Sequence, residues 1–422
     1  RGLVCSVHGD DFTTAGEKLQ LDWFEDSLEA KYELKREGRL GPGPNDKKEL
    51  SVLNRILRYT PQGIEYEADP RQCERLLEEL GLDDDCKKAA TPGLKPLGHQ
   101  LEADVPLDEK DHTKFRGTAA RANYLASDRS DVQYASKETC RFMSSPTELS
   151  MGALKRLGRF LLGAKRLIYK YEWQTADRIE CYSDTDWSGC GRTRRSTSGG
   201  CIMIGTHCIK TWSTTQPTVT LSSGEAEFYG VVKASGAALG QQSLLRDLGV
   251  DLPVRVWTDS SAALGICSRS GLGKLRHLET HTLWVQEKIR TGAFVLMKVK
   301  GDVNPADLFT KHLSSSDRVK MLVSLFGCEY RSGRAASAPL LRPNARGDDH
   351  LPDVPEADDS AGDLEAFYLD EAGITHRDAL RHDERRLPHN HTEEEIAKFF
   401  PVLSVPPPDS NIDDWIPGGD NT

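Results

Sequence analysis

The most restrictive feature of this sequence is the order in which strand and helix patterns follow one another between residues 178 and 326. Three strand patterns with short turns precede a long helix, and strands and helices then alternate. The expected strands are 178–186, 199–205, 206–213, 254–258 and 293–299, and the expected helices are 222–247, a short one from Ser260, 275–290 and 304–326. This order predicts an α/β domain in which helices flank a mixed five-stranded sheet.

Four acidic residues fall at the ends of these expected elements. Asp184 lies on the first strand, and Glu227 lies in the first turns of the long helix. Asp259 ends the fourth strand, and Asp307 opens the last helix. In a sheet of this order the first and fourth strands can lie side by side, with the two helix starts over them. We therefore expect the four carboxylates to gather at one site.

Carboxylates placed close together repel one another unless cations neutralise them. Mg²⁺ prefers oxygen ligands, and two such ions roughly 3.5–4 Å apart can act together on one phosphodiester. Taken singly, each residue has an ordinary explanation: Asp259 can cap a helix, Asp307 can favour a helix dipole, and Glu225 and Glu227 can lie on the surface. Taken together, they favour a site for two Mg²⁺ ions, with Mn²⁺ as the alternative.

The chain before residue 178 has a different, α+β pattern. A strand–turn–strand at 1–16 has Gly9, Asp10 and Asp11 at its turn. The further expected elements are a charged helix at 17–38, a ribbon at 50–66, a helix at 70–81, a loop at 87–111 and helices at 112–126, 131–143 and 147–163. After residue 331 the sequence is rich in Pro, Asp, Ser and Gly, which predicts a mostly disordered acidic tail.

Charge is distributed unevenly along the chain. The formal net charge of −10 argues by itself against nucleic-acid binding, but acidic segments and the tail account for much of it. A basic block runs from Lys155 to Lys170 and includes Arg159, and a second comprises Arg192, Arg194 and Arg195. Local basic patches, rather than net charge, decide whether a nucleic-acid backbone can bind.

Several features limit where the protein can work. The ten cysteines include no CxxC pair, which argues against a zinc ribbon, and we expect them to be reduced. No apolar stretch reaches membrane-spanning length and no signal peptide is present, so we expect an intracellular protein that neither is secreted nor contacts a membrane. The chain opens at Arg1 within a strand-like run, so we expect a fragment of a longer protein.

Five segments carry a resemblance to a known family. They are Tyr182-Ser-Asp-Thr-Asp-Trp-Ser-Gly-Cys, Arg194-Arg-Ser-Thr-Ser-Gly-Gly, Gln216-Pro-Thr-Val-Thr-Leu-Ser-Ser-Gly-Glu-Ala-Glu, Thr258-Asp-Ser-Ser-Ala-Ala-Leu and Ala306-Asp-Leu-Phe-Thr-Lys. In order and spacing they resemble the ribonuclease H domain of copia-type retrotransposon Pol polyproteins. The resemblance implies a ribonuclease H-like fold at 178–325 that cuts the RNA strand of an RNA–DNA hybrid.

The resemblance also implies roles for individual residues. The catalytic, metal-binding carboxylates of the family fall on Asp184, Glu227, Asp259 and Asp307. A different alignment could instead promote Asp186 or Glu225, so these alternatives stay open. Lys300 to Pro305 contain no histidine, and no general-base histidine is assigned.

Upstream, the chain resembles the end of the family's reverse transcriptase. The matching segments are His8-Gly-Asp-Asp, Phe115-Arg-Gly, Asn123-Tyr-Leu, Arg129-Ser-Asp-Val-Gln-Tyr-Ala and Arg141-Phe-Met-Ser-Ser-Pro-Thr. They imply a partial palm and thumb at 1–110 and connection helices at 111–177, with Asp10 and Asp11 as polymerase metal ligands. Composition rather than resemblance assigns 326–422 to the tail. The missing palm and fingers would leave the polymerase part inactive alone.

Partners and location follow from the same resemblance. The hybrid is the expected nucleic-acid partner, with phosphates bound by Lys155, Arg159 and the three arginines at 192, 194 and 195. Trp187 and Trp212 are expected in the core. The polyprotein, including its integrase, is the expected protein partner, in a cytoplasmic virus-like particle with a nuclear location left open. The alternative is a decayed or domesticated remnant that binds nucleic acid or other proteins without cutting.

Overall fold

The computed structural model describes residues 2–341. Its larger domain is built on a five-stranded sheet in the order β11-β10-β7-β8-β9. The strands are β7 (Ile179–Asp186), β8 (Thr197–Ile204), β9 (His207–Thr215), β10 (Val254–Thr258) and β11 (Val295–Lys298). β7, β10 and β11 run parallel, and β8 and β9 run antiparallel to their neighbours. The expected mixed five-stranded α/β sheet is therefore confirmed.

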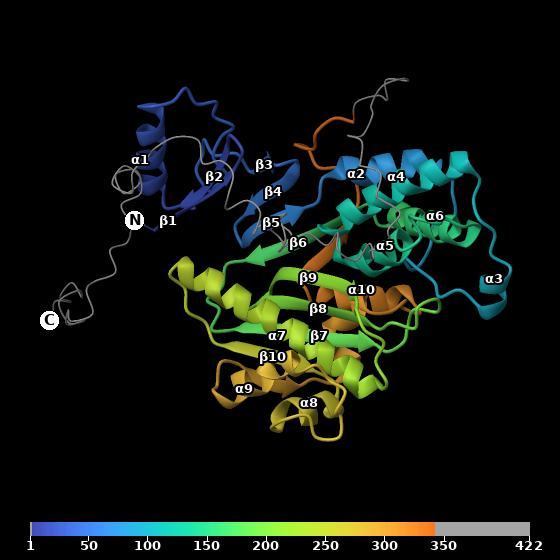
Figure 1. Ribbon diagram of the computed structural model, residues 1–422. Helices are drawn as coiled ribbons and strands as arrows, with labels where there is room; N and C mark the ends of the chain where they lie inside the picture. The colour runs from blue at the N-terminus through green and yellow to red at the C-terminus, as the bar shows by residue number, and fades with distance from the viewer. Residues whose placement is uncertain (1, 342–422) are drawn as a thin grey trace, which may run out of the picture. The chain divides into compact units, whose positions relative to one another are not determined.

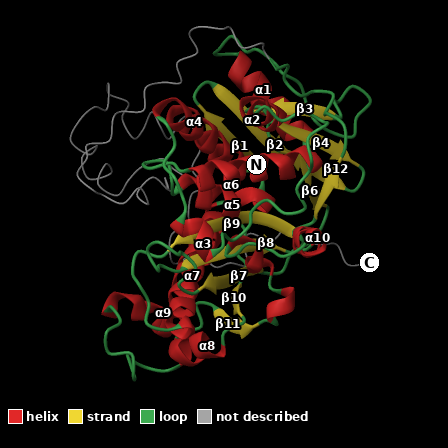
Figure 2. Ribbon diagram, turned by 90° about the vertical axis from the view of Figure 1, so that its right-hand side faces the viewer, coloured by secondary structure: helices red, strands yellow, loops and turns green. Residues whose placement is uncertain are grey.

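One face of this sheet is covered by the long helix α7 (Ser223–Asp247), which packs on β7, β8 and β10 (Figure 1). Alternate residues of β7 face this helix, and the Cys181 thiol reaches the Ala234 carbonyl at 3.4 Å. Figure 2 shows α8 (Ser261–Ser268) and α9 (Trp284–Arg290) beside β10 and β11. The expected helix at 275–290 begins later, as the 3-10 turn η2 (Thr280–Leu283) followed by α9.

A second five-stranded sheet joins segments that lie far apart in the sequence. Its order is β12-β6-β5-β4-β3, and all neighbours are antiparallel. The strands are β3 (Glu49–Val52), β4 (Arg55–Thr60), β5 (Gly63–Glu67), β6 (Arg166–Glu172) and β12 (Cys328–Arg331). The sequence analysis predicted the ribbon of β4 and β5 but neither β6 nor β12. Arg166, buried in β6, pairs with buried Glu67 in β5 at 2.6 Å and fastens the two strands.

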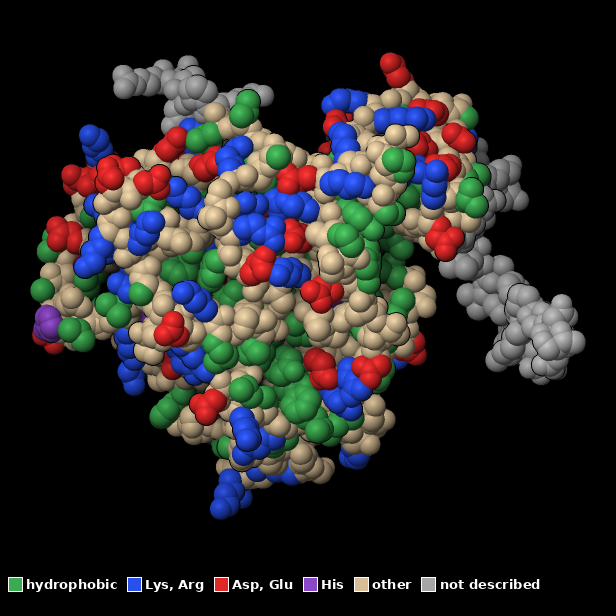
Figure 3. Space-filling view, turned by 180° about the vertical axis from the view of Figure 1, so that it is seen from behind, with side chains coloured by type: hydrophobic (Ala, Val, Ile, Leu, Met, Phe, Trp, Pro, Cys, Tyr) green, Lys and Arg blue, Asp and Glu red, His purple; other side chains and the backbone are tan. Residues whose placement is uncertain are grey.

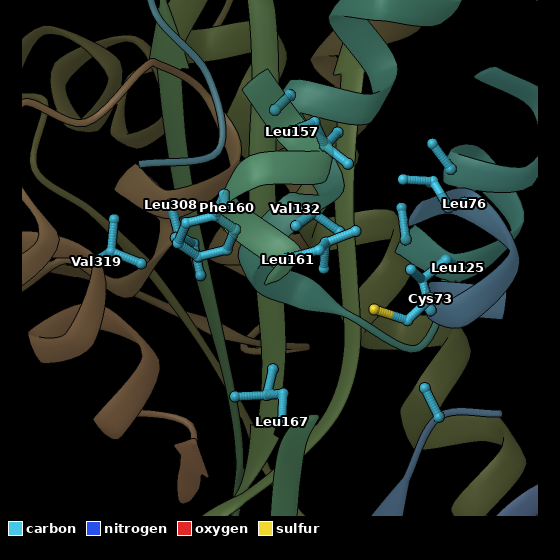
Figure 4. Close-up of a cluster of buried hydrophobic side chains, with 14 of the residues drawn as sticks. Cys73, Leu76, Leu125, Val132, Leu157, Phe160, Leu161, Leu167, Leu308 and Val319 are labelled. Carbon is cyan, nitrogen blue, oxygen red and sulfur yellow. The ribbon is translucent and has the colours of Figure 1, made fainter. Parts of the chain in front are cut away.

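Helices between the two sheets share one hydrophobic core with them. The predicted helix at 70–81 is α2 (Pro70–Leu80), which Asp69 caps and Gly81 ends in the left-handed conformation. The other helices are α3 (Gly98–Glu102), α4 (Glu109–Ala126), η1 (Ser130–Val132), α5 (Gln133–Cys140) and α6 (Glu148–Gly163). Figure 4 shows side chains of this core, including Leu76, Leu125, Leu157, Phe160, Leu161, Leu308 and Val319.

The expected helix at 304–326 is wrong, because the chain breaks it into two pieces. The structure has η3 (Gly301–Val303), η4 (Pro305–Phe309) and α10 (Ser316–Ser324). Between the pieces the chain passes close to β8, where a Cβ on Gly199 would lie 2.9 Å from the Phe309 carbonyl carbon. Ser315 then starts α10 by accepting a hydrogen bond from the Arg318 amide at 3.2 Å. Because the helix is broken, η4 can pack along the sheet, which one continuous helix over 304–326 could not do.

The N-terminal part is a hairpin of β1 (Leu3–His8) and β2 (Asp11–Gly16) followed by α1 (Lys18–Glu29). α1 is shorter than the expected helix at 17–38. All ten cysteines are free, as expected. Within residues 2–341, no helix is long and apolar enough to span a membrane. Most of the tail that we expect to be disordered lies outside the described residues.

Candidate metal centre

The centre begins with two aspartates on neighbouring parallel strands. Ser183 on β7 pairs with Thr258 on β10, so the following residues, Asp184 and Asp259, lie side by side where β10 ends. Glu227 reaches them from the first turns of α7. One carboxylate oxygen from each of the three lies within 4.8 Å of the others. The structure therefore brings together three of the four carboxylates that the sequence singled out.

Burial makes this cluster electrostatically costly without a cation. Burial, together with the nearby charges of Asp184 and Asp259, raises the pKa of Glu227 to about 9. Burial also raises the pKa of Asp184 to about 6, with Lys311 opposing the shift and Asp307 adding to it. The pKa of Asp259 is raised by burial and by Asp307. These shifts are those of carboxylates held together for a cation to neutralise.

One atom of the cluster lacks any hydrogen-bond partner. Glu227 Oε2 is buried and accepts no hydrogen bond from the part of the chain that the structure describes. A buried carboxylate oxygen without a partner is costly, and a bound ion would remove that cost. The donor set, three carboxylates without sulfur or imidazole, suits Mg²⁺ or Mn²⁺. The residues present therefore fit a hard divalent cation.

Asp307 lies beside this cluster but is not among the three. It is buried in η4, where its Oδ1 pairs with Lys311 at 2.7 Å and its Oδ2 pairs with Arg318 at 2.7 Å. The same Lys311 ammonium lies 3.6 Å from Asp184 Oδ2. Asp184 Oδ2 also accepts a hydrogen bond from the Thr310 hydroxyl. Asp307 is thus linked to the cluster through a lysine.

Sequence reasoning missed Lys311, although one signal could have found it. Lys311 follows Asp307 by four residues, a spacing at which oppositely charged side chains can pair. It also missed Asn304, which is fully buried and anchors η4 to the sheet. The Asn304 amide nitrogen donates to the Ser183 carbonyl at 3.0 Å, and its side-chain oxygen accepts from the Ala306 amide at 3.1 Å.

The two alternative carboxylates have other surroundings. Glu225 is buried and accepts hydrogen bonds from the Leu221 amide at 2.9 Å and from His277 at 3.0 Å. Asp186 is the last residue of β7 and is not in the group of three. Both residues lie outside the set of oxygens within 4.8 Å, which supports the choice of Asp184 and Glu227 over them.

The basic residues singled out from the sequence fall on two separate segments. Arg192 and Arg194 are exposed in the loop between β7 and β8, and Arg195 is half-buried there. Arg192 donates to the Arg141 carbonyl at 3.1 Å. On α6, Lys155 is exposed, whereas Arg159 is half-buried and its Nε has no hydrogen-bond partner. On the face shown in Figure 3, Lys and Arg side chains are interspersed with Asp and Glu.

Asp10 and Asp11 lie at the turn of the β1–β2 hairpin, and both are exposed. Among the described residues, no cluster of potential metal ligands includes them. Of the two tryptophans expected in the core, Trp212 is buried. Trp187 is 46% exposed, so that expectation is wrong for it. Trp187 follows the last residue of β7, and its Nε1 donates to the Thr220 carbonyl at 3.2 Å, in the loop that precedes α7.

The sheet order and the carboxylates at its strand ends define a class of protein, the ribonuclease H-like domains. Among solved structures, LC11-RNase H1 in complex with an RNA/DNA hybrid is 18% identical to this chain, with a TM-score of 0.22, over 32% of this chain and 94% of that one. No protein-family model matches the chain.

Curated relatives identify the family. The retrovirus-related Pol polyprotein from transposon RE1 of Arabidopsis thaliana is 32% identical over 48% of this chain and 14% of that polyprotein. The uncharacterized mitochondrial protein AtMg00810 of the same plant is 31% identical over 41% of this chain and 70% of that protein. The chain belongs to the family of copia-type retrotransposon Pol polyproteins, as its motifs suggested. It spans about a seventh of the length of the RE1 polyprotein.

Proposed function

We propose that the chain carries a ribonuclease H that hydrolyses the RNA strand of an RNA–DNA hybrid with two Mg²⁺ ions, Mn²⁺ being the alternative. The observation that carries this proposal is the convergence of Asp184, Glu227 and Asp259 within 4.8 Å, with a buried Glu227 oxygen that has no partner. Clustered carboxylates with raised pKa values are typical of catalytic sites that bind hard cations. A purely structural role would not explain a buried Glu227 oxygen that has no partner among the described residues.

The residues that would hold the ions are Asp184, Glu227, Asp259 and Asp307. When bound, the ions would supply electrostatic stabilisation for the charge that develops on a phosphodiester as it is hydrolysed. Residues around them would keep the ligands in place. Asn304 fixes η4 to β7, and the Ser213 hydroxyl donates to the Phe309 carbonyl at 2.6 Å at the other end of η4. The ligand from η4 is thereby held against the ligands from the sheet.

The substrate would be recognised through its backbone. The exposed guanidinium groups of Arg192 and Arg194 lie in the loop that follows Asp184, and we propose that they, with Arg195, contact phosphates. Lys155 and Arg159 are proposed as more distant phosphate contacts on α6. Recognition of a hybrid by shape and by the 2′-hydroxyl would then explain cleavage of RNA without reading of base edges.

The remaining segments are proposed to act as parts of the same polyprotein. Residues 1–110 would supply a partial palm and thumb, with Asp10 and Asp11 as metal ligands, residues 111–177 the connection, and residues 178–325 the nuclease. The family resemblance supports this division, and the helices at 109–163 pack against both sheets. The partners would be the other polyprotein domains, including the integrase, in a cytoplasmic virus-like particle.

The test is cleavage of a labelled RNA–DNA hybrid by the full chain with Mg²⁺ and with EDTA. We expect internal cuts in the RNA strand with Mg²⁺, none with EDTA, and none in a DNA duplex of the same sequence. Asp259→Asn should abolish cutting and leave hybrid binding within about twofold, because binding rests on basic contacts. Binding without cutting by the unmodified chain would favour the remnant hypothesis instead.

A further inference from the structure

The candidate metal centre contains a cation of its own. The Lys311 ammonium lies 2.7 Å from Asp307 Oδ1 and 3.6 Å from Asp184 Oδ2. A divalent ion shared by these two carboxylates would need oxygens that Lys311 now contacts. Since an ammonium and a metal ion cannot both occupy the space between the same oxygens, the two must compete for this side of the centre.

Asp307 has a second cationic partner that is held more firmly. Arg318 pairs with Asp307 Oδ2 at 2.7 Å and also donates to the carbonyl oxygens of Asp302 and Gly301. Its side chain is 24% exposed, whereas that of Lys311 is 44% exposed. The ion pairs of Lys311 are both with carboxylates of the centre. Within residues 2–341, Lys311 can therefore turn into solvent without breaking an ion pair outside the centre, whereas Arg318 would lose its hydrogen bonds to Asp302 and Gly301.

The Glu227 ligand differs from the two carboxylates that Lys311 contacts. Glu227 Oε2 is buried and has no hydrogen-bond partner, so an ion can bind without first displacing a donor from it. Among the described residues, the centre thus offers one ligand atom without a donor, on Glu227, and two carboxylates that a lysine contacts, Asp184 and Asp307. Two ions would therefore bind under unequal conditions: one would bind to a ligand atom that has no donor, and the other would compete with Lys311.

We infer that Lys311 is a displaceable counter-ion that holds the Asp184–Asp307 side of the centre until a second divalent ion replaces it. The first ion would bind through Asp184, Glu227 and Asp259 with Lys311 in place. The second would bind only as Lys311 leaves, and the released ammonium would then lie at the mouth of the centre, where it can pair with a substrate phosphate. This inference rests on the proposed function, and it makes Lys311 a positioning residue.

Calcium alone is the probe, because Ca²⁺ prefers the same oxygen ligands and its binding can be measured without substrate. Isothermal titration of the full chain should show one tighter Ca²⁺ site and one weaker site. In Lys311→Met the weaker site should tighten by about tenfold, since the competing charge is gone. Lys311→Arg should behave like the unmodified chain. Unchanged or weakened binding of the second ion in Lys311→Met would overturn the inference.

Lys298→Met is the matched control. Lys298 is an exposed lysine near Asp259, and its ammonium contacts the Ser261 hydroxyl rather than a carboxylate. Removing its charge should change either calcium affinity by no more than about twofold. A change as large as that in Lys311→Met would mean that general charge, rather than occupancy, controls binding, and would also overturn the inference.

Thermal unfolding provides a second readout if Lys311→Met is poorly folded. Lys311→Gln should melt at a lower temperature than the unmodified chain in EDTA and should gain more from saturating Ca²⁺. An equal gain in both proteins would count against displacement. Failure of the proposed function can be told apart from failure of this inference. A chain that binds Ca²⁺ through Asp259 and responds to Lys311→Met as described, yet never cuts a hybrid, would refute the nuclease proposal and leave the inference standing.

Discussion

Replacing Asp259 with asparagine should stabilise the metal-free protein while removing its response to Mg²⁺. At pH 7.5 Glu227 is mostly protonated, since its pKa is raised to about 9, so the main repulsion in the cluster is between Asp184 and Asp259. Asp184, with a pKa of about 6, is mostly ionised at that pH. Asparagine preserves the shape of the side chain and removes one of the two charges.

The size of the effect follows from the spacing of the oxygens. Two unit charges about 4.8 Å apart repel by roughly 3 kcal/mol at an effective dielectric constant of about 20. Lys311, close to Asp184, offsets part of this repulsion. We therefore expect Asp259→Asn to raise the free energy of unfolding in EDTA by about 1–3 kcal/mol, which corresponds to an increase in Tm of about 2–8 °C.

Excess Mg²⁺ should reverse the order of the two melting temperatures, so that the unmodified chain melts above Asp259→Asn. A ligand at a hundredfold excess over its Kd adds about 2.7 kcal/mol to the stability of the protein that binds it. The unmodified chain should gain this amount, and Asp259→Asn should gain little because it lacks one ligand. Differential scanning fluorimetry in EDTA and in excess Mg²⁺ measures both terms on the same samples.

The matched control is Asp302→Asn, which removes a charge from an exposed residue close to the centre but outside the cluster. It should leave both melting temperatures within about 1 °C of those of the unmodified chain. The reasoning is refuted if Asp259→Asn melts below the unmodified chain in EDTA, or if Mg²⁺ raises both proteins equally.

Three further predictions concern pH, the anchor of η4 and the C-terminal strand. In EDTA the Tm should fall as pH rises from about 5 to 9, because the folded chain keeps protons on Asp184 and Glu227 that the unfolded chain has already lost. Circular dichroism melts measure this Tm. A Tm that rises over the interval would contradict the raised pKa values. Asn304→Ala should lower the free energy of unfolding in urea by about 2–4 kcal/mol, since two buried hydrogen bonds are lost, and a loss below about 1 kcal/mol would mean that η4 is held by other contacts. A chain ending at residue 341 should cut hybrids as the full chain does. A chain ending at residue 325 loses β12 and should be insoluble or inactive. Equal activity of the two truncated chains would show that β12 is dispensable.

Much of the nuclease fold could be predicted because its strands and helices have clear local patterns. β10, with Val254 and Val256 buried on one face, and the long helix α7 are recognisable without knowing what they pack against. β12 could not be found in this way, because it has only four residues and is stable through its pairing with β6. β6 was not predicted because Arg166 and Lys170 are typical of a basic surface segment. In the structure Arg166 is buried against Glu67.

The carboxylate ligands of the candidate site could be predicted from the sequence, but the salt bridges around Asp307 could not. Asp184 stands out because it lies on the first strand, and Asp259 because it directly follows the fourth; the strand order then places them together. The salt bridges that tie Asp307 to Lys311 and Arg318 depend on the break between η4 and α10. That break arises from close packing of residues 309–310 against Gly199, a tertiary contact with no local sequence pattern.

The pairing of β6 with β12 has a consequence for synthesis on the ribosome. The chain enters the nuclease domain from β6 and leaves it into β12, and these two strands are adjacent and antiparallel, so the whole domain is an insertion at one edge of the second sheet. The outer edge of β6 therefore stays unpaired until residues 328–331 have been translated and the domain between them has brought the two strands together. An open strand edge during that interval can pair with a neighbouring nascent chain. Slow translation through the nuclease segment should thus increase aggregation of this protein, and rapid folding of that segment should protect it.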